Sequence, residues 1–495
     1  MAARARTDRI SKIVREVFGL PSLRPGQDAA IESVLARRHT LAVMPTGAGK
    51  SLCYQVAAML MPGMTVVISP LIALMRDQVD KLSALGLQAV QVNSAVPAAA
   101  IQQARATIGR RAVEFVFTTP EQLATDSFRK TLSKAGVDLV VIDEAHCISE
   151  WGHDFRPAYL EALHELRALG TPTILALTAT ATSQVIADIE RQLGVGPLRI
   201  INTGAHRPNL SYQVKPVSSE DDKQRHLIEI LRAASGPTIV YAATVRHVNA
   251  LEALLTAEGI RATSYHGRLS SRDRSAAQDA FMAGSVPVVV ATNAFGLGID
   301  KPDIRTVVHY DLPPSLDVYS QESGRAGRDG EPADCILLFQ RRDRGLQRFF
   351  MAGRYPSRDD FSALIEGLRP SAGKGAMTVA EIQAVVPSVA AGKVKVMVAA
   401  LKQGRLLIAR RGGRFEVGAA LHSTSVEPFV TAYDDRRQRD QAKLEQMIVY
   451  AQTALCRTRV LLDALGEAVE WSGCGRCDNC RGEAIRATAP AAGAA

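Results

Sequence analysis

Short apolar runs alternate with amphipathic stretches through residues 40–339, and this alternation is the strongest constraint on the fold. One series of runs lies at residues 40–44, 65–69, 114–118, 139–143 and 174–178. A second series lies at 238–241, 262–265, 286–292, 306–310 and 335–339. Strand-sized runs separated by helical patterns are typical of parallel sheets with crossover helices. The sequence therefore predicts two α/β lobes in tandem, connected by residues 201–224.

The alternation ends after Phe339, and other patterns follow. Residues 359–418 give two or three short helical patterns and then two brief strands, as in a winged helix-turn-helix. A purely structural helical insert is an open alternative. The expected domains are a first lobe at 1–205, a second lobe at 206–345, a winged-helix-like module at 346–425, a helical zinc-binding module at 426–483 and a disordered tail at 484–495.

The charge balance favours an anionic partner. Lysine and arginine together number 59, against 50 aspartates and glutamates, which gives a net charge of +9 at pH 7. This excess fits a polyanion such as nucleic acid, but over 495 residues it also fits an ordinary basic enzyme. The motifs along the chain must decide between the two.

The N-terminal segment predicts the compartment. It is basic, but no apolar stretch follows it, and no apolar run in the chain reaches the length of a membrane span. We therefore expect a cytoplasmic protein without a membrane partner, in which cysteines are thiols or metal ligands. Cys53, Cys147 and Cys335 stand singly among apolar residues, which predicts buried thiols.

Residues 44–51, Met-Pro-Thr-Gly-Ala-Gly-Lys-Ser, lie where a phosphate-binding loop is expected, between an apolar run and a helical pattern. Glycine residues let the main-chain amides close on an anion, the lysine reaches the terminal phosphates and the serine can bind Mg²⁺. The expected nucleotide contacts are Thr46, Gly47, Gly49, Lys50 and Ser51. The strict pattern has glycine where this chain has methionine, so a turn that only caps a helix is the alternative.

Two adjacent carboxylates, Asp143 and Glu144, end the apolar run that precedes Ala145 and His146. Ligands of open α/β sheets bind at the carboxyl ends of the strands, where these acids would lie. Asp143 would hold Mg²⁺, and Glu144 would orient and deprotonate the attacking water. A helix N-terminus that favours acidic residues is the alternative.

Further motifs follow in order along the chain. They are FGLPSLRPGQ at 18–27, SPLIALMRDQ at 69–78, LTATAT at 177–182, YHG at 265–267, ATNAFGLGID at 291–300 and QESGRAGR at 321–328. With the phosphate loop and the acidic pair, this series resembles the RecQ-type DNA helicases of superfamily 2. The resemblance implies two tandem RecA-like lobes, with ATP and Mg²⁺ as cofactors.

The resemblance also implies roles for single residues. Gln27 would read the adenine, while Arg325 and Arg328 would reach the γ-phosphate as arginine fingers from the second lobe. Guanidinium groups suit the charge of a phosphoryl transition state, and fingers on a second lobe make hydrolysis depend on lobe closure. Further residues implied in the same site are Arg24, Asp300 and Gln321. For the peptide 324–328 alone, a basic surface turn is the alternative.

An aromatic-rich segment, residues 149–159, follows the acidic pair and resembles the loop that marks RecQ proteins among related helicases. Trp151 and Phe155 could stack on unpaired bases, and Arg156 could bind phosphate. DNA bound to this loop would act a few residues from Glu144, which offers a route by which DNA could stimulate hydrolysis. Aromatic side chains beside a strand are otherwise more often part of the core.

Four cysteines near the C-terminus have the number and spacing of a structural Zn²⁺ site: Cys456, Cys474, Cys477 and Cys480. An iron–sulfur cluster would accept the same ligands. Zinc ranks first because RecQ proteins carry it at the matching motif. In that family a winged helix usually follows the zinc module, whereas the candidate winged helix here precedes it, which makes the strength of duplex unwinding uncertain from sequence.

The function implied is an ATP-dependent DNA helicase that moves 3′ to 5′ on single-stranded DNA and acts in repair or recombination. Its partners would be single-stranded DNA, forked or overhanging duplexes, and single-strand-binding and repair proteins. Three alternatives remain: a DNA-stimulated translocase or remodeller with little unwinding, an RNA helicase, and a binding protein that has lost hydrolysis.

Overall fold

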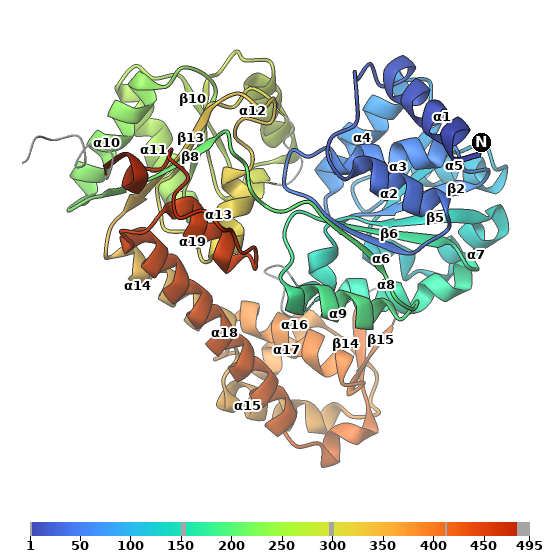
Figure 1. The fold of residues 1–495 in the computed structure, drawn as a ribbon. Coiled ribbons are helices and arrows are strands. Elements are labelled where there is room, and N and C mark those ends of the chain that lie inside the picture. Colours follow the sequence, from blue (N-terminus) through green and yellow to red (C-terminus); the bar gives the residue numbers. More distant parts are fainter. Residues whose placement is uncertain (1, 150–154, 297–300, 411–412, 483–495) are drawn as a thin grey trace, which may run out of the picture. The chain divides into compact units, whose positions relative to one another are not determined.

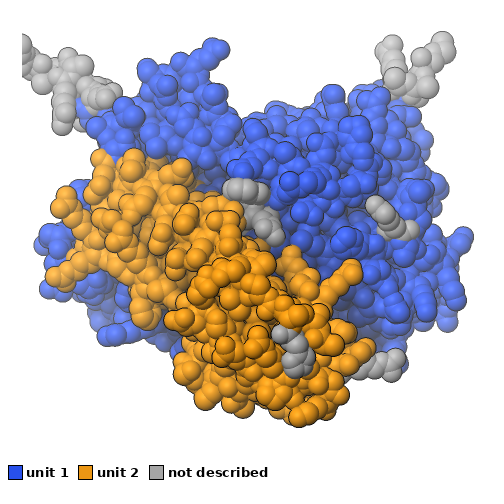
Figure 2. Space-filling model, turned by 90° about the horizontal axis from the view of Figure 1, so that it is seen from below, with its two compact units in different colours: residues 1–311, 317–338, 453–495 blue, residues 312–316, 339–452 orange. Residues whose placement is uncertain are grey.

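The computed structural model describes residues 2–149, 155–296, 301–410 and 413–482. The chain divides into two compact units, which Figure 2 shows in different colours. Unit 1 holds Met1–Asp311, Asp317–Leu338 and Thr453–Ala495, and unit 2 holds Leu312–Leu316 and Phe339–Gln452. Each unit is described by itself below. The tail predicted at 484–495 lies outside the described residues.

The first lobe of unit 1 is built on a seven-stranded sheet in the order β3-β4-β2-β5-β6-β1-β7. Figure 1 labels β2, β5 and β6 of this sheet. Each strand pairs in parallel with its neighbours. The strands are β1 (Thr40–Val43), β2 (Met64–Ile68), β3 (Ala89–Val92), β4 (Phe115–Thr118), β5 (Val137–Ile142), β6 (Thr173–Thr178) and β7 (Arg199–Asn202). The helices are α1 (Ala2–Glu16), α2 (Gln27–Leu35), α3 (Lys50–Met59), α4 (Ile72–Ala84), α5 (Ala98–Gly109), α6 (Pro120–Leu123), α7 (Asp126–Ala135), α8 (Pro157–Leu166) and α9 (Ser183–Leu193).

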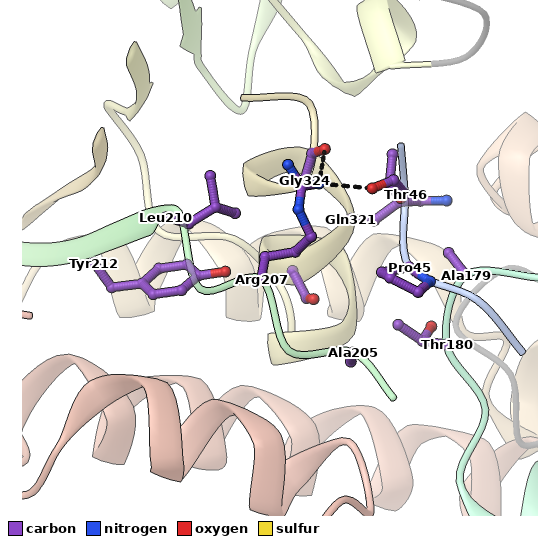
Figure 3. A pocket seen from close by; sticks show the side chains of 11 residues that line it. Pro45, Thr46, Ala179, Thr180, Ala205, Arg207, Leu210, Tyr212, Gln321 and Gly324 are labelled. Atoms are coloured by element: carbon purple, nitrogen blue, oxygen red, sulfur yellow. Dashed lines mark hydrogen bonds between the residues drawn. The ribbon is translucent and has the colours of Figure 1, made fainter. Parts of the chain in front are cut away.

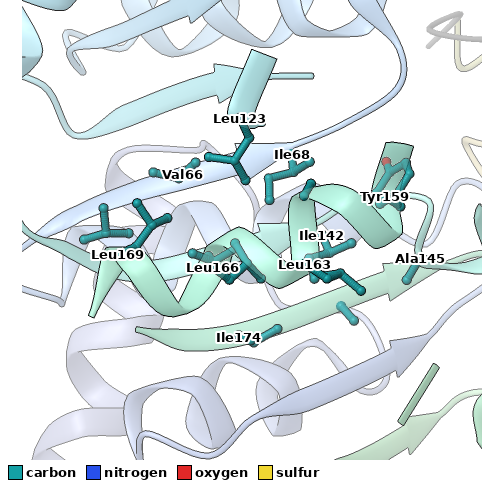
Figure 4. Packing of buried hydrophobic residues seen from close by; sticks show 14 of the residues in the cluster. Val66, Ile68, Leu123, Ile142, Ala145, Tyr159, Leu163, Leu166, Leu169 and Ile174 are labelled. Atoms are coloured by element: carbon teal, nitrogen blue, oxygen red, sulfur yellow. The ribbon is translucent and has the colours of Figure 1, made fainter. Parts of the chain in front are cut away.

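Two apolar clusters cover the two faces of this sheet, because successive side chains of a strand point to opposite faces. In β2, Val66 and Ile68 belong to one cluster and Val67 to the other. Figure 4 shows the first cluster, in which Leu163 and Leu166 of α8 pack over the sheet. A strand buried on both faces must be apolar throughout, which explains the continuous runs in the sequence.

The second lobe of unit 1 has a six-stranded sheet in the order β10-β11-β9-β12-β13-β8. Its strands are β8 (Leu210–Pro216), β9 (Thr238–Tyr241), β10 (Ala262–Tyr265), β11 (Val288–Ala291), β12 (Thr306–His309) and β13 (Ala333–Phe339). Its helices are α10 (Glu220–Ala233), α11 (Val245–Ala257), α12 (Ser271–Met282) and α13 (Leu316–Ser323). The prediction of two parallel-sheet, RecA-like lobes is confirmed.

Residues 201–224, predicted as the connection between the lobes, also contain regular secondary structure that the sequence analysis did not predict. β7 ends within this segment, β8 lies inside it and α10 begins in it. Both strands lie at the edge of a sheet, where one side of the strand has no neighbour. Three of the four residues of β7 are exposed, and β8 mixes polar with apolar side chains, so neither gives the continuous apolar run of a central strand.

Unit 2 combines helices with a small antiparallel sheet in the order β14-β16-β15. Its strands are β14 (Ala376–Thr378), β15 (Leu407–Arg410) and β16 (Arg414–Val417). Its helices are α14 (Asp343–Arg354), α15 (Arg358–Leu368), α16 (Val379–Val385), α17 (Ala391–Gln403) and α18 (Glu427–Gln452). Three helices followed by a two-stranded hairpin form the winged-helix-like arrangement expected from the sequence, closed around a core of its own.

The contact pattern groups α18 with unit 2, whereas α19 (Arg457–Ala464) and the four cysteines belong to unit 1. The sequence-based limits placed α18 and the cysteines together, and those domain limits stay predictions. In the described part of the chain, no helix is both long and apolar enough to cross a bilayer.

The core of the first lobe gives a stability prediction. We expect Leu123→Ala to lower the free energy of unfolding of this lobe by about 2–5 kcal/mol, because the side chain is fully buried and its loss leaves a cavity. Hydrogen exchange of the β2 and β5 amides in rising urea would measure the loss. Leu85→Ala, at a position 42% exposed, is the control; an equal loss in both variants would contradict the packing described.

Candidate functional site

The phosphate loop joins β1 to α3. Met44 continues β1 by one residue, since its N–H donates to the Thr178 carbonyl at 3.0 Å, and its side chain is fully buried. That position is therefore part of the core, which explains why an apolar side chain stands there instead of glycine. Gly47 and Gly49 have φ of +86° and +76°, a left-handed conformation that glycine adopts at little cost.

Lys50 begins α3 and lies among the charges of the site. Its ammonium group donates to the carbonyl oxygens of Met44 at 3.1 Å and Pro45 at 3.5 Å. Burial lowers the pKa of Lys50, the charges of Glu144 and Asp143 raise it, and Arg328 lowers it further. The lysine, both acids and one candidate finger are thus close enough to interact.

Gln27 and Arg24 lie against the phosphate loop. The Gln27 amide group donates to the carbonyls of Ala48 and Gly49, both at 2.9 Å, and its carbonyl oxygen accepts from the Arg24 N–H at 2.8 Å. The Arg24 guanidinium donates to the Gly47 carbonyl and, at 3.5 Å, to that of Arg328. Both residues therefore bind carbonyl groups of the phosphate loop, while the reading of adenine by Gln27 stays a prediction.

The acidic pair follows β5 directly. The Asp143 N–H donates to the Ile68 carbonyl at 2.9 Å, and its carboxylate accepts from Ser69 Oγ at 3.1 Å. Tyr159 Oη fixes the Asp143 carbonyl at 2.8 Å. Burial raises the pKa of Asp143 to about 6, with the Glu144 charge acting in the same direction and Lys50 opposing it.

Glu144 has φ of +50° and ψ of +49°, which is uncommon for a residue with a side chain. Its carboxylate lies 3.3 Å from His146 Nδ1, and the same ring nitrogen lies 3.1 Å from Thr178 Oγ1 at the end of β6. His146 therefore connects the acidic pair to residues 177–182, a motif to which sequence reasoning gave no role. Strained backbone of this kind clusters at functional sites.

The end of α13 and the residues after it form the second side of the candidate site. Gln321 and Gly324 line a small pocket with Thr46 of the phosphate loop (Figure 3). Arg328 lies close to Gly47. A Cβ built on Gly47 would be only 3.0 Å from Arg328 Cγ. Arg325 is only 4% exposed, and its charge opposes the rise in pKa that burial causes at Tyr241, the last residue of β9. The structure thus brings Arg328 to the phosphate loop and places Arg325 against the second sheet.

Part of the candidate DNA loop lies outside the described residues, as do Trp151 and Asp300. The ends of the loop are held near the acidic pair. Ser149 Oγ donates to Asp188 at 2.7 Å, and the Arg156 N–H donates to the Cys147 carbonyl at 2.9 Å. Phe155 and Arg156 are half-buried.

The four C-terminal cysteines converge, with their sulfur atoms all within 4.8 Å of one another. The N–H groups of Arg476 and Cys477 donate to Cys474 Sγ at 3.4 and 3.3 Å. Burial alone would raise the pKa of Cys474, but hydrogen bonds from Thr458 and these two N–H groups outweigh it and lower the pKa to about 6. Four sulfur atoms placed this closely fit a tetrahedral zinc ion, which binds cysteine as the thiolate.

This cysteine module is bound to the segment that joins the two lobes. Asp478 accepts from the Val214 N–H at 2.9 Å and from Arg457 Nε at 2.6 Å. Trp471 packs on His206, with ring centroids 5.4 Å apart. Sequence reasoning missed these contacts, because Val214, His206 and Trp471 belong to no recognised motif, and the cysteine motif that contains Asp478 does not reveal its partners.

Comparisons with protein families match three parts of the chain. Residues 24–189 match the DEAD/DEAH box helicase model, 222–330 the helicase conserved C-terminal domain and 421–481 the RecQ zinc-binding model. ATP-dependent DNA helicase RecQ of Bacillus subtilis is 42% identical over 345 residues, which cover 69% of this chain and 58% of that protein. The chain belongs to the RecQ family of superfamily 2 helicases.

Two further relatives agree with this RecQ assignment. A putative ATP-dependent DNA helicase Q1 of Caenorhabditis briggsae is 42% identical, over 68% of this chain and 56% of that protein. The probable helicase RecS of Bacillus subtilis is 40% identical, over 67% of this chain and 66% of that protein. The chain thus spans little more than half the length of the first two curated relatives it matches.

Solved structures share the fold at lower identity. The Mycobacterium smegmatis helicase Lhr bound to single-stranded DNA and AMP-PNP is 23% identical with a TM-score of 0.57, over 83% of this chain and 60% of that one. The DUF1998 helicase MrfA bound to DNA is 19% identical with a TM-score of 0.56, over 85% and 60%. At these identities the likeness concerns the fold.

The loop geometry gives a prediction for nucleotide binding. We expect Gly49→Ala to weaken binding of a fluorescent ATP analogue at least about tenfold, because a left-handed alanine is strained and its Cβ would lie 2.6 Å from Gln27 Nε2. Gly109→Ala, which has free space at its Cβ, is the matched control. Unchanged affinity in Gly49→Ala would count against this loop as the nucleotide site.

The cysteine cluster gives a prediction for metal content. We expect purified protein to hold about one zinc per chain and no iron, and Cys477→Ser to lose most of the zinc because three thiolates bind it less tightly. Elemental analysis measures both metals. Cys335→Ser removes a buried thiol outside the cluster and should keep the zinc. Iron in the wild-type protein would instead identify an iron–sulfur cluster.

Proposed function

We propose that this chain is an ATP-driven DNA motor, which hydrolyses ATP, moves 3′ to 5′ on single-stranded DNA and unwinds duplex ahead of it. The observation that carries the proposal is the contact of Arg328 with Gly47 of the phosphate loop, next to Lys50, whose pKa responds to the charges of both acids and of Arg328. These residues come from both lobes of unit 1, so the site can be completed or opened as the lobes move. Because the site is complete only in one arrangement of the lobes, ATP hydrolysis can be coupled to a movement of one lobe relative to the other.

In this proposal each group acts through its chemistry. The loop amides and Lys50 bind the phosphates, and the oxygens of Ser51 and Asp143 hold Mg²⁺, a cation that prefers oxygen ligands. Glu144, in contact with His146, orients and deprotonates the attacking water. Arg328 stabilises the charge that develops on the transferred phosphoryl group, and Arg325 is the second candidate arginine finger.

The residues proposed to bind DNA lie on the loop that follows the acidic pair. Phe155, with Trp151, would stack on unpaired bases, and Arg156 would bind phosphate. The Arg156 N–H is tied to the Cys147 carbonyl, three residues after Glu144, so a shift of the loop on DNA would be felt at the acidic pair. This connection supports stimulation of hydrolysis by single-stranded DNA. Forked and overhanging duplexes, single-strand-binding proteins and repair proteins are the partners proposed.

The decisive variant is Glu144→Gln. We expect it to keep ATP binding but to lower the DNA-stimulated kcat by about 10²–10⁴-fold, because an amide cannot accept the proton of the attacking water. Hydrolysis is measured with and without single-stranded DNA or RNA, and unwinding on duplexes with a 3′ or a 5′ overhang. Glu229→Gln, at an exposed position of α10, is the matched control.

Each result of these assays identifies one of the alternative functions or contradicts the proposed one. Hydrolysis stimulated by DNA without unwinding would identify a translocase or remodeller, and stimulation by RNA alone would identify an RNA helicase. Unwinding from the 5′ overhang would reverse the proposed direction. No hydrolysis by the wild-type chain with either nucleic acid would reject the motor.

A further inference from the structure

Arg207 lies between β7 and β8 and binds loops from both lobes. Its Nη1 donates to the Thr46 carbonyl of the phosphate loop at 2.7 Å and to the Gly324 carbonyl at 3.3 Å (Figure 3). Its Nη2 donates to the carbonyls of Ala326 at 3.1 Å and Gly327 at 2.7 Å. One guanidinium group therefore joins the phosphate loop to residues 324–328, which we call the finger loop.

The partners of Arg207 are neutral oxygens. A fifth hydrogen bond, from Nε to the Asn209 side-chain carbonyl at 3.3 Å, holds the group in its plane. Burial lowers the pKa of Arg207, because removing part of the cation's water shell costs free energy. Salt bridges to nearby carboxylates would be the common use of such an arginine. Its use on main-chain carbonyls indicates a role in fixing backbone positions.

Asn209 binds the same loop and shares the Gly327 carbonyl with Arg207. Its amide group donates to the carbonyls of Gly327 and Glu331, both at 2.8 Å. Gly327 has φ of +54°, and a Cβ there would lie 2.5 Å from Asn209 Nδ2. The finger loop is therefore shaped against this pair, and its main chain has little room to shift while both residues are bound.

The two loops approach closely at the point where Arg207 binds them. A Cβ on Gly324 would lie 3.1 Å from Thr46 Cβ, and a Cβ on Gly47 would lie 3.2 Å from Arg207 Nη1. Arg328 follows Gly327 directly in sequence, and its side chain also lies close to Gly47. The position of Arg328 over the phosphate loop thus depends on contacts that converge on Arg207.

We propose that Arg207 is a positioning residue for ATP hydrolysis. It sets the spacing between the phosphate loop and the finger loop, and so aligns Arg328 without taking part in the chemistry itself. The inference rests on the proposed ATPase and goes beyond it by assigning a role to a residue of the connecting segment. Phosphoryl transfer depends on such alignment, since a misplacement of about 1 Å can cost about 10²-fold in rate.

The test compares Arg207→Ala, Arg207→Lys and Arg305→Ala in the full chain. Arg305 is the control, because it also donates to a nearby carbonyl, that of Pro332 at 3.3 Å, and pairs with Asp329, but does not bind the phosphate loop. For Arg207→Ala we expect affinity for an ATP analogue within about threefold of wild type and a fall in kcat of about 10–100-fold. The Arg207→Lys variant should recover little of the lost kcat, since the lysine side chain lacks the planar set of donors that a guanidinium group has.

A second measurement does not depend on hydrolysis. Hydrogen exchange of the peptide 321–328, which holds the partners of Arg207 in the finger loop but not Asp329 or Pro332, should become faster in Arg207→Ala and stay unchanged in Arg305→Ala, with equal melting temperatures. If the wild-type chain hydrolyses no ATP but this difference is found, the motor proposal fails while the anchoring role of Arg207 stands. Wild-type kcat in Arg207→Ala, equal losses of kcat and affinity together with a lower melting temperature, or unchanged exchange would each overturn the inference.

Discussion

The parallel pairing of β6 between β1 and β5 is the constraint on which the site depends. In the register of this sheet Val43 of β1 lies opposite Thr178, and Ile142 of β5 lies opposite Ala176. The three strands therefore end at the same edge, so the phosphate loop, the acidic pair and the 177–182 motif must meet there. The hydrogen bond from the Met44 N–H to the Thr178 carbonyl, and the one between His146 Nδ1 and Thr178 Oγ1, then hold the three segments together.

The charges gathered at that edge are costly to hold without a ligand. Burial raises the pKa of Asp143 and lowers that of Lys50, and in each case the neighbouring opposite charge opposes the shift. The left-handed backbone of Glu144 adds strain of about 1–3 kcal/mol. A site that is strained and desolvated before substrate arrives is prepared for a highly charged ligand, and the apolar layers on both faces of the sheet hold it in place.

The sequence predicted those parts of the molecule that local patterns encode. Central strands give continuous apolar runs, and the phosphate loop and acidic pair are short motifs whose neighbours in sequence are also neighbours in space. The edge strand β10 was predicted at residues 262–265, so edge position alone does not hide a strand. The edge strands β3, β7 and β8 were missed because polar or partly exposed side chains interrupt their apolar runs. Arg207 could not be recognised either: its partners at Thr46 and Gly327 lie 161 and 120 residues away, and only the folded chain brings them together.

The segment that joins the lobes is held from two sides, which gives it a role that its length would not suggest. At Arg207 and Asn209 it binds the phosphate and finger loops. At Ser211 and Val214 it binds the cysteine module, through the Arg476 carbonyl at 3.2 Å and the Asp478 carboxylate at 2.9 Å. Ser211 and Val214 belong to β8, and only Leu210 separates Asn209 from Ser211, so one short stretch of chain binds both sets of partners. The structure therefore ties the geometry of the nucleotide site mechanically to the module that carries the four cysteines.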